Sequence, residues 1–123
     1  MHELSIAENI LEILKSNMGE GDSAIRIKVR VGDLAGVAVD SLVFCFDAIT
    51  DGTPFRETRL EIERVGVTAR CSRCESIQEI HEFRFKCSSC DSDDVEIVAG
   101  NELQVVEIEV DGRVKESNEC HNN

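Results

Sequence analysis

Four cysteines in the second half of the chain have the spacing of a metal site. They form two C-x-x-C pairs, Cys71 with Cys74 and Cys87 with Cys90, separated by twelve residues. Each pair can make a tight turn whose two thiolates point the same way, and two facing turns give the tetrahedron of closed zinc sites. Four thiolates leave no open position on the ion, so the pattern predicts a structural Zn(II) rather than a catalytic one.

Other uses of these thiols remain open at the level of the sequence. Soft thiolates also suit iron, as in a rubredoxin-like electron carrier, and reactive thiols can serve redox regulation. Four apolar residues lie between the two pairs: Ile77, Ile80, Phe83 and Phe85. A lobe with so little core is expected to need its metal in order to fold.

The first residues offer a second set of metal donors. His2 is one of three histidines, and the bulky side chain at position 2 is expected to leave Met1 and its free amine in place. An α-amine, an imidazole and amide nitrogens can enclose a square-planar ion, a geometry that suits Ni(II) or Cu(II). The alternative is a solvated surface histidine without a role.

The charge of the chain restricts its partners. The net charge is −12 over 123 residues, which disfavours phosphate backbones and anionic membranes and suits a basic protein or a cation. Residues 66–98 carry four basic and seven acidic side chains, so a nucleic-acid-binding zinc ribbon lacks its main source of affinity. The chain has no apolar run long enough to span a membrane and no basic segment typical of a signal peptide, so a cytoplasmic protein is expected.

Hydrophobic periodicity indicates the elements that position these groups. Apolar residues at three- and four-residue steps predict helices over residues 4–18 and 41–50, the second capped by Asp40 or Ser41. Alternating patterns predict strands over residues 24–31, 58–65 and 102–110. Ile25, Ile27, Val29 and Val31 are expected to share the buried face of the first strand.

These elements indicate an α+β fold. Two helices are expected on one face of a three-stranded mixed sheet, with a small zinc-ribbon-like β lobe inserted before the last strand. We expect an α+β domain over residues 1–65 plus 101–112, a zinc domain over residues 66–100, and a flexible tail over residues 113–123. Gly66 and Gly100 flank the insert and could act as hinges.

The combined motifs resemble a known family. M-H-E-L-S-I-A at the N-terminus, the central G-T-P-F-R-E-T-R-L-E-I-E and C-x-x-C-x12-C-x-x-C are similar to the HypA/HybF nickel metallochaperones of hydrogenase maturation. The resemblance covers residues 1 to about 112. It departs at Val39-Asp40, where a Pro-Glu pair is usual, and residues 115–123 lie outside the pattern.

The resemblance implies a nickel-binding α+β domain and an inserted zinc domain. It places Ni(II) on the Met1 amine, His2 and Glu3, and Zn(II) on the four cysteines. It also implies that the nickel goes to the large subunit of [NiFe]-hydrogenase with the help of a HypB-type GTPase. Some relatives serve the urease accessory system, and a homodimer is compatible with the resemblance.

Two hypotheses about the function are therefore possible. The first is a nickel carrier without enzymatic activity, since the sequence has no phosphate-binding G-x-x-x-x-G-K-[ST] loop and no catalytic triad pattern. The second is a zinc-ribbon module that binds protein or nucleic acid without a nickel role.

The remaining histidines and cysteines have weaker signals. His81 could complete the nickel site if the zinc lobe folds back, although a solvated strand residue is the simpler interpretation. Cys45 is expected to be a small buried apolar residue. Cys120 and His121 could chelate a metal adventitiously.

Overall fold

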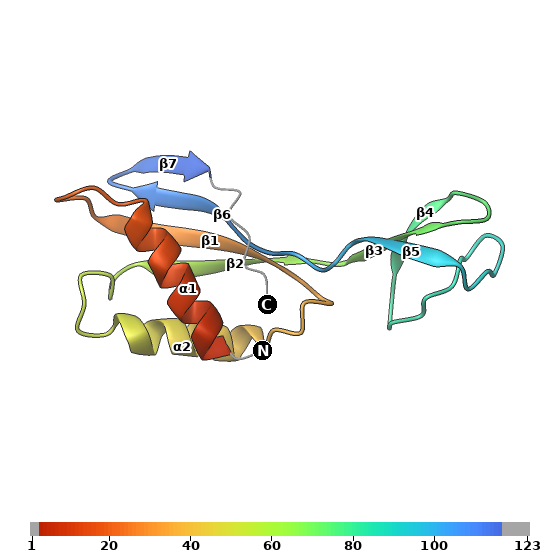
Figure 1. The fold of residues 1–123 in the computed structure, drawn as a ribbon, viewed down its shortest axis with the longest axis horizontal. Coiled ribbons are helices and arrows are strands. Elements are labelled where there is room, and N and C mark those ends of the chain that lie inside the picture. The colour runs from red at the N-terminus through yellow and green to blue at the C-terminus, as the bar shows by residue number, and fades with distance from the viewer. Residues whose placement is uncertain (1–2, 117–123) are drawn as a thin grey trace.

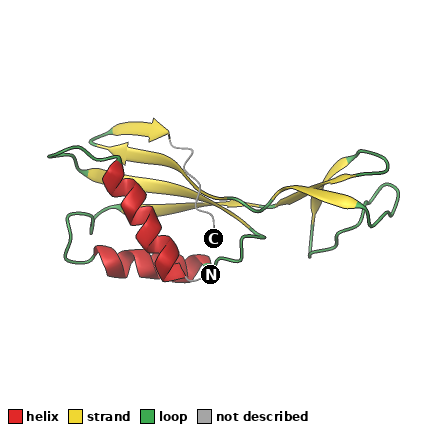
Figure 2. Cartoon of the chain, viewed as in Figure 1, coloured by secondary structure: helices red, strands yellow, loops and turns green. Residues whose placement is uncertain are grey.

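The structure is a computed structural model that describes residues 3–116. Two lobes of unequal size lie at the ends of an elongated molecule (Figures 1 and 2). The elements, in chain order, are α1 (Glu3–Ser16), β1 (Ala24–Gly32), α2 (Val39–Thr50), β2 (Arg59–Val65), β3 (Val67–Cys71), β4 (Ile77–Ile80), β5 (Val95–Ala99), β6 (Leu103–Val110) and β7 (Arg113–Glu116).

The larger lobe contains a mixed four-stranded sheet. Its strand order is β2-β1-β6-β7, with β2 parallel to β1 and the other neighbours antiparallel. The α+β class and the two helices agree with the prediction, but the expected three-stranded sheet is wrong. The cysteine-bearing insert consequently precedes the last two strands rather than the last one.

The additional strand is β7, which occupies residues that the sequence assigns to the tail. Asp111 and Gly112 both have positive φ angles, of 50° and 80°. Two such residues in succession make the tight turn that matches the twist of a hairpin, and Asp-Gly is a favoured pair there. The chain therefore reverses after β6, and Val110 pairs with Arg113. Residues 117–123, with Cys120 and His121, lie outside the described part of the chain.

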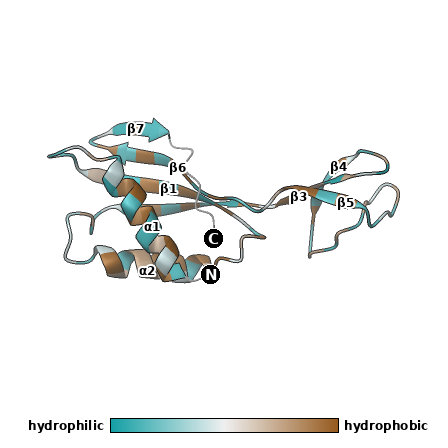
Figure 3. Cartoon of the chain, viewed as in Figure 1, coloured by the Kyte–Doolittle hydropathy of each residue, from teal (hydrophilic) through white to brown (hydrophobic). Residues whose placement is uncertain are grey.

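The main core lies between the two helices and the sheet, and both helices contribute buried side chains to it. Ile6, Ile10 and Leu14 of α1 and Leu42 and Phe46 of α2 are buried together with residues of β1 and β6. Hydrophobic and hydrophilic residues alternate along these strands (Figure 3). Residues 27, 29 and 31 are buried as expected, but Ile25 is 39% exposed because the ladder with β6 is irregular between positions 24 and 26.

The start of α2 differs from the prediction. The helix begins at Val39, and its capping position is Ala38, which provides no side-chain hydrogen bond. Asp40 and Ser41 therefore lie inside the first turn. Glu3 of α1 supplies a partner instead, because its Oε2 accepts a hydrogen bond from the Ala38 N–H at 3.1 Å. A carboxylate is favourable at this positive end of a helix, so the start of α2 is stabilised from a neighbouring helix.

The smaller lobe is built around a three-stranded antiparallel sheet in the order β4-β3-β5. Its buried cluster consists of Val67, Ala69 and Ile80, with Val95 and Ile97 packed against it. This cluster is separate from the main core, so each lobe has apolar residues of its own. No helix within residues 3–116 is long and apolar enough to cross a membrane.

Candidate metal centre

The four predicted cysteines converge at one end of the smaller lobe. All four Sγ atoms of Cys71, Cys74, Cys87 and Cys90 lie within 4.8 Å of one another. The Sγ–Sγ distance is 3.5 Å for Cys71 with Cys90 and for Cys74 with Cys87. A disulfide requires about 2.05 Å, so these sulfurs are close but not bonded. Each short distance joins one C-x-x-C pair to the other.

The first pair forms a turn around the sulfur of Cys71. The backbone N–H groups of Arg73 and Cys74 donate to this Sγ at 3.4 and 3.5 Å. The Glu75 N–H then closes the turn on the Cys71 carbonyl at 2.9 Å. Glu75 has a φ of 60°, the left-handed conformation that turns the chain back toward β4.

The second pair repeats this geometry. The N–H groups of Ser89 and Cys90 both donate to the Cys87 Sγ at 3.4 Å. The Asp91 N–H closes the turn on the Cys87 carbonyl at 2.8 Å, and the φ of Asp91 is 59°. Two equivalent turns therefore face each other, each presenting one sulfur that accepts two backbone hydrogen bonds.

The sulfur arrangement fits a tetrahedral zinc ion. Zinc–sulfur bonds of about 2.3 Å give tetrahedron edges of about 3.8 Å, which lies between the shortest and longest sulfur separations here. Cys71 and Cys87 are buried, whereas Cys74 and Cys90 are exposed. An ion at this position is therefore held at the surface of the lobe, with its ligand set closed by four thiolates.

The thiols influence one another's ionisation. Hydrogen bonds from the Ser76 side chain and from the Cys90 backbone lower the pKa of Cys87 to about 6. Backbone donation, first from Cys74, also lowers the pKa of Cys71. At Cys90 the Ser92 N–H favours the thiolate, but Cys71, burial and the other cysteines outweigh it and raise the pKa to about 12. Four neighbouring thiolates repel one another, so a divalent cation is the natural counter-charge for the full set.

Two polar residues of the centre, Ser76 and Gln78, have no motif in the sequence that predicts their role. The Ser76 Oγ lies 3.1 Å from the Cys74 Sγ and 3.5 Å from the Cys87 Sγ, so it contacts both pairs. Gln78 of β4 bridges to the second turn, donating to the Lys86 carbonyl at 3.0 Å and accepting from the Ser88 N–H at 2.9 Å. Serine and glutamine give no motif of their own, and only the position of Ser76 just after the first pair hints at its role.

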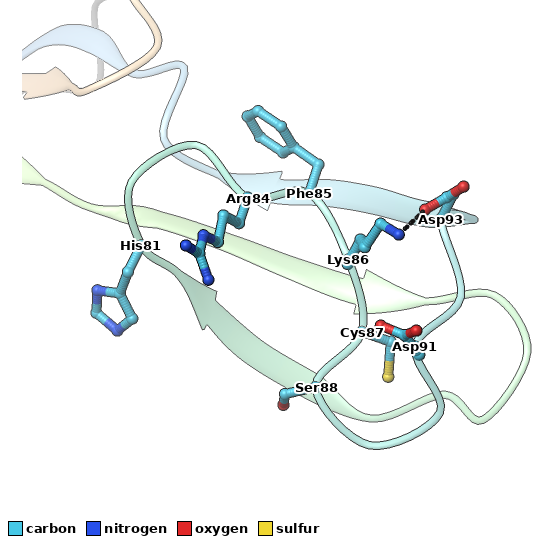
Figure 4. A pocket seen from close by; sticks show the side chains of 8 residues that line it. All are labelled: His81, Arg84, Phe85, Lys86, Cys87, Ser88, Asp91 and Asp93. Atoms are coloured by element: carbon cyan, nitrogen blue, oxygen red, sulfur yellow. Dashed lines mark ion pairs between the residues drawn. The ribbon is translucent and has the colours of Figure 1, made fainter.

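A cavity of about 720 Å³ adjoins the second cysteine pair (Figure 4). Arg84 and Lys86 line it together with Asp91 and Asp93, and the Lys86 Nζ pairs with the Asp93 carboxylate at 3.5 Å. His81 lies at its edge, and its Nε2 is 3.5 Å from the Glu79 carboxylate. The mixed charges do not form the basic surface that nucleic acid requires.

Of the predicted nickel ligands, the structure describes Glu3, while Met1 and His2 lie outside the described residues. Glu3 is the first residue of α1, and its carboxylate contacts the Ala38 N–H at the start of α2. Cys45 lies far along the sequence from the other cysteines and packs half-buried against the main core.

Comparisons with known proteins agree with the arrangement of the elements. The solution structure of the nickel metallochaperone HypA from Helicobacter pylori superposes with a TM-score of 0.58. It covers 88% of this chain and 96% of its own, at 22% sequence identity. A likeness at this identity shows a shared fold.

Similarity in sequence carries the family assignment. The "Hydrogenase maturation factor HypA" of Geobacter sulfurreducens is 36% identical over 111 residues, covering 90% of this chain and all of its own length. The protein of the same name from Desulfosudis oleivorans is 39% identical over 113 residues, covering 89% of this chain and 98% of its own. The family model described as "Hydrogenase/urease nickel incorporation, metallochaperone, hypA" matches residues 1–110. The chain therefore belongs to the HypA family of nickel metallochaperones.

Proposed function

We propose that this chain carries Ni(II) at its N-terminus and helps insert it into the large subunit of [NiFe]-hydrogenase. The observation that carries the proposal is the family match, which begins at residue 1 and so includes Met1, His2 and Glu3. An amine, an imidazole and amide nitrogens provide the nitrogen donors that Ni(II) accepts in a planar arrangement. Such a short, open site suits a carrier, because the ion must leave again.

The four cysteines are proposed to hold a structural Zn(II). The two facing turns, the sulfur separations and the closed ligand set support this assignment. The zinc stabilises the small lobe, whose own buried cluster is minor. Nickel and zinc thus have different tasks, one as cargo and the other as part of the folded protein, and neither requires an enzymatic reaction.

The proposed partners are a HypB-type GTPase and the hydrogenase large subunit. The family description also includes urease, so an accessory system of that enzyme is a second recipient to test. The excess of acidic residues supports protein partners with basic surfaces over nucleic acid or a membrane. We place the chain in the cytoplasm, where thiolates stay reduced, and a homodimer remains a prediction for measurements of mass in solution.

A zinc-ribbon module without a nickel role is the alternative. It predicts a protein that takes up zinc at the cysteines and whose affinity for Ni(II) is the same with and without His2. The charge of the small lobe gives this alternative little support as a nucleic-acid binder.

A nickel titration of the zinc-loaded protein separates the two functions. In His2→Ala, we expect loss of tight nickel uptake with zinc content unchanged at one ion per chain. His81→Ala is the matched control and is expected to bind nickel like the parent, because His81 belongs to the small lobe beside Glu79. Nickel affinity in His2→Ala equal to that of the parent would rule out the N-terminal site.

A further inference from the structure

The loop between β1 and α2, residues 33–38, contacts both metal-binding parts of the molecule. It leaves the sheet where the two lobes meet and ends at the helix that Glu3 touches. The family motifs lie outside this loop, and neither the nickel nor the zinc assignment uses it. Its contacts at the two ends indicate that it connects the junction between the lobes to the start of α1.

The beginning of the loop is bound to the junction between the lobes. The Asp33 N–H donates to the Val65 carbonyl at 2.9 Å, at the end of β2. The Leu34 N–H donates to the Gly100 carbonyl at 2.8 Å, where the chain returns from the small lobe. Both chain crossings between the lobes are therefore hydrogen-bonded to this loop.

Side chains of the loop are divided between the two cores. Leu34 packs against the small-lobe cluster of Val67, Ala69 and Ile80. Ala35 and Val37, one and three residues later, pack against the main core. Leu34 therefore joins the beginning of the loop to the small lobe, while Ala35 and Val37 join its later part to the larger lobe.

The far end of the loop holds the start of α1. Ala38 donates its N–H to Glu3, the residue next to His2, at 3.1 Å. The Ala38 carbonyl also accepts from the Leu42 N–H at 2.9 Å, so Ala38 is fixed to α2 as well. A shift of the loop therefore moves the partner of Glu3.

We propose that Leu34 is a positioning residue for the nickel site. Its side chain, packed against the small-lobe cluster, sets the loop so that Ala38 holds Glu3 and the first turn of α1. This inference rests on the proposed nickel site at Met1 and His2. It makes nickel affinity depend on the folded zinc lobe, and such a coupling between two sites is reciprocal.

Leu34→Ala tests the proposal in a nickel titration, with zinc content measured on the same samples. We expect one zinc per chain and nickel affinity about tenfold below that of the parent, a coupling of ordinary size. In the parent, removal of zinc should lower nickel affinity by a similar factor. In Leu34→Ala, removal of zinc should have little further effect, because the connection is already broken.

Ile97→Ala is the matched control. Ile97 packs against the same small-lobe cluster as Leu34 but comes from β5. With zinc bound, this variant should have the nickel affinity of the parent, although its small lobe loses a comparable amount of packing. Equal losses of nickel affinity in Leu34→Ala and Ile97→Ala would overturn the positioning role.

A second variant tests the other end of the loop. Ala38→Pro removes the N–H that Glu3 accepts, and the φ of −79° at Ala38 is one that proline adopts. It should reproduce the tenfold loss with zinc unaffected, and combination with Leu34→Ala should add little. If both variants bind nickel like the parent, the positioning role is wrong. If the parent binds no nickel, or His2→Ala binds it normally, the proposed nickel site has failed instead.

Discussion

Position 32 is restricted to glycine by a neighbouring segment. A Cβ on Gly32 would lie 2.0 Å from the Gly100 carbonyl oxygen, far inside any tolerated contact. The same residue donates its N–H to the Glu102 carbonyl at 2.7 Å, so the backbone cannot simply move away. Gly66, at the other crossing between the lobes, has open space around the place of a Cβ.

These two glycines give a prediction with its own control. Gly32→Ala is expected to lower the free energy of unfolding by about 3 kcal/mol, as overpacking at a fixed backbone does. Gly66→Ala should change it by less than about 0.5 kcal/mol, because the added methyl group meets nothing. Urea unfolding followed by circular dichroism measures both. Similar values for the two variants would mean that the backbone around Gly100 shifts at little cost to accommodate the methyl group.

The difference between these glycines shows what a sequence can predict at single residues. The cluster of four cysteines is predictable, because each C-x-x-C turn is local and its spacing is visible in the chain. The demand on Gly32 arises from Gly100, which is distant in sequence and adjacent in space. The role of Ser76 is likewise hidden, because its contact with Cys87 exists only after the two turns meet.

At the scale of elements, α2 has two phenylalanines with opposite environments. Phe46 is fully buried in the main core, whereas Phe44 is 73% exposed. Phe46→Ala is expected to cost about 3–5 kcal/mol of unfolding free energy, because it leaves a cavity among packed side chains. Phe44→Ala should stay within about 0.5 kcal/mol of the parent. Thermal and urea unfolding provide the values. A large loss of stability in Phe44→Ala would contradict the orientation of α2, in which Phe44 faces away from the core.

On the face of the main sheet that points away from the core, side chains of opposite charge join neighbouring strands. Arg26 donates to Glu107 at 3.1 Å and to Glu109 at 2.9 Å, so β1 and β6 are joined by side chains as well as by their ladder. On the other side, Arg30 donates to Glu63 of β2. Glutamates of β2 and β6 thus lie on either side of the basic residues of β1.

The Glu63 pair gives a pH dependence with a definite sign. The hydrogen bond from Arg30 and the nearby Lys28 hold the pKa of Glu63 below its ordinary value of 4.5. The stabilisation is therefore present above the unfolded-state pKa and is lost as the pH falls through the lower folded-state pKa. Relative to the parent, Glu63→Gln should be less stable at pH 7, and the difference should shrink on acidification.

Arg30→Gln is the control for this prediction. Once Arg30 is removed, the further change Glu63→Gln should have a much smaller effect, because the pair is already broken. Urea midpoints of the four proteins between pH 3 and pH 7 complete the cycle. A pH-independent difference would assign the effect of Glu63 to packing rather than to charge.

The elements that the sequence predicts are those with a strong period. The two helices and strands β1 and β6 bury one face each, and β2 places Leu60 and Ile62 against the main core, which leaves a visible pattern. Strand β7 has four exposed residues and no alternation, so it is specified by the preceding Asp111-Gly112 turn and by the free edge of β6. The short strands of the small lobe are similarly weak in pattern, since their core is only a few residues deep.

At the scale of the whole molecule, two cores are connected by one narrow junction. The main core unites both helices with the four-stranded sheet, whereas the small lobe has the cluster of Val67, Ala69 and Ile80. The chain crosses between them at Gly66 and Gly100, and within residues 3–116 Leu34 packs against the small cluster from the loop that follows β1. The lobes are thus expected to differ in their dependence on metal.

Removal of zinc should unfold the small lobe and leave the larger one folded. Structural zinc contributes roughly 10–16 kcal/mol in small zinc domains, far more than a cluster of this size can supply. In amide NMR spectra of the chelated protein, signals of β3, β4 and β5 should collapse to unfolded positions, while those of α1, β1 and β6 persist. Cys71→Ser should behave like the chelated parent, and Cys45→Ser, which leaves all four clustered thiols, should not.

The loop of residues 33–38 contacts both cores, so its amide signals report whether the two lobes respond separately to removal of zinc. Its amide signals should shift when zinc is removed, since Leu34 loses the cluster against which it packs, although the strand before it stays folded. Simultaneous loss of the α1 and β6 signals would instead show that the two cores fold as one cooperative unit. If the lobes do separate, zinc occupancy controls the position of Ala38 and Glu3 without unfolding the lobe that carries them, which is the condition for one metal to tune the binding of another.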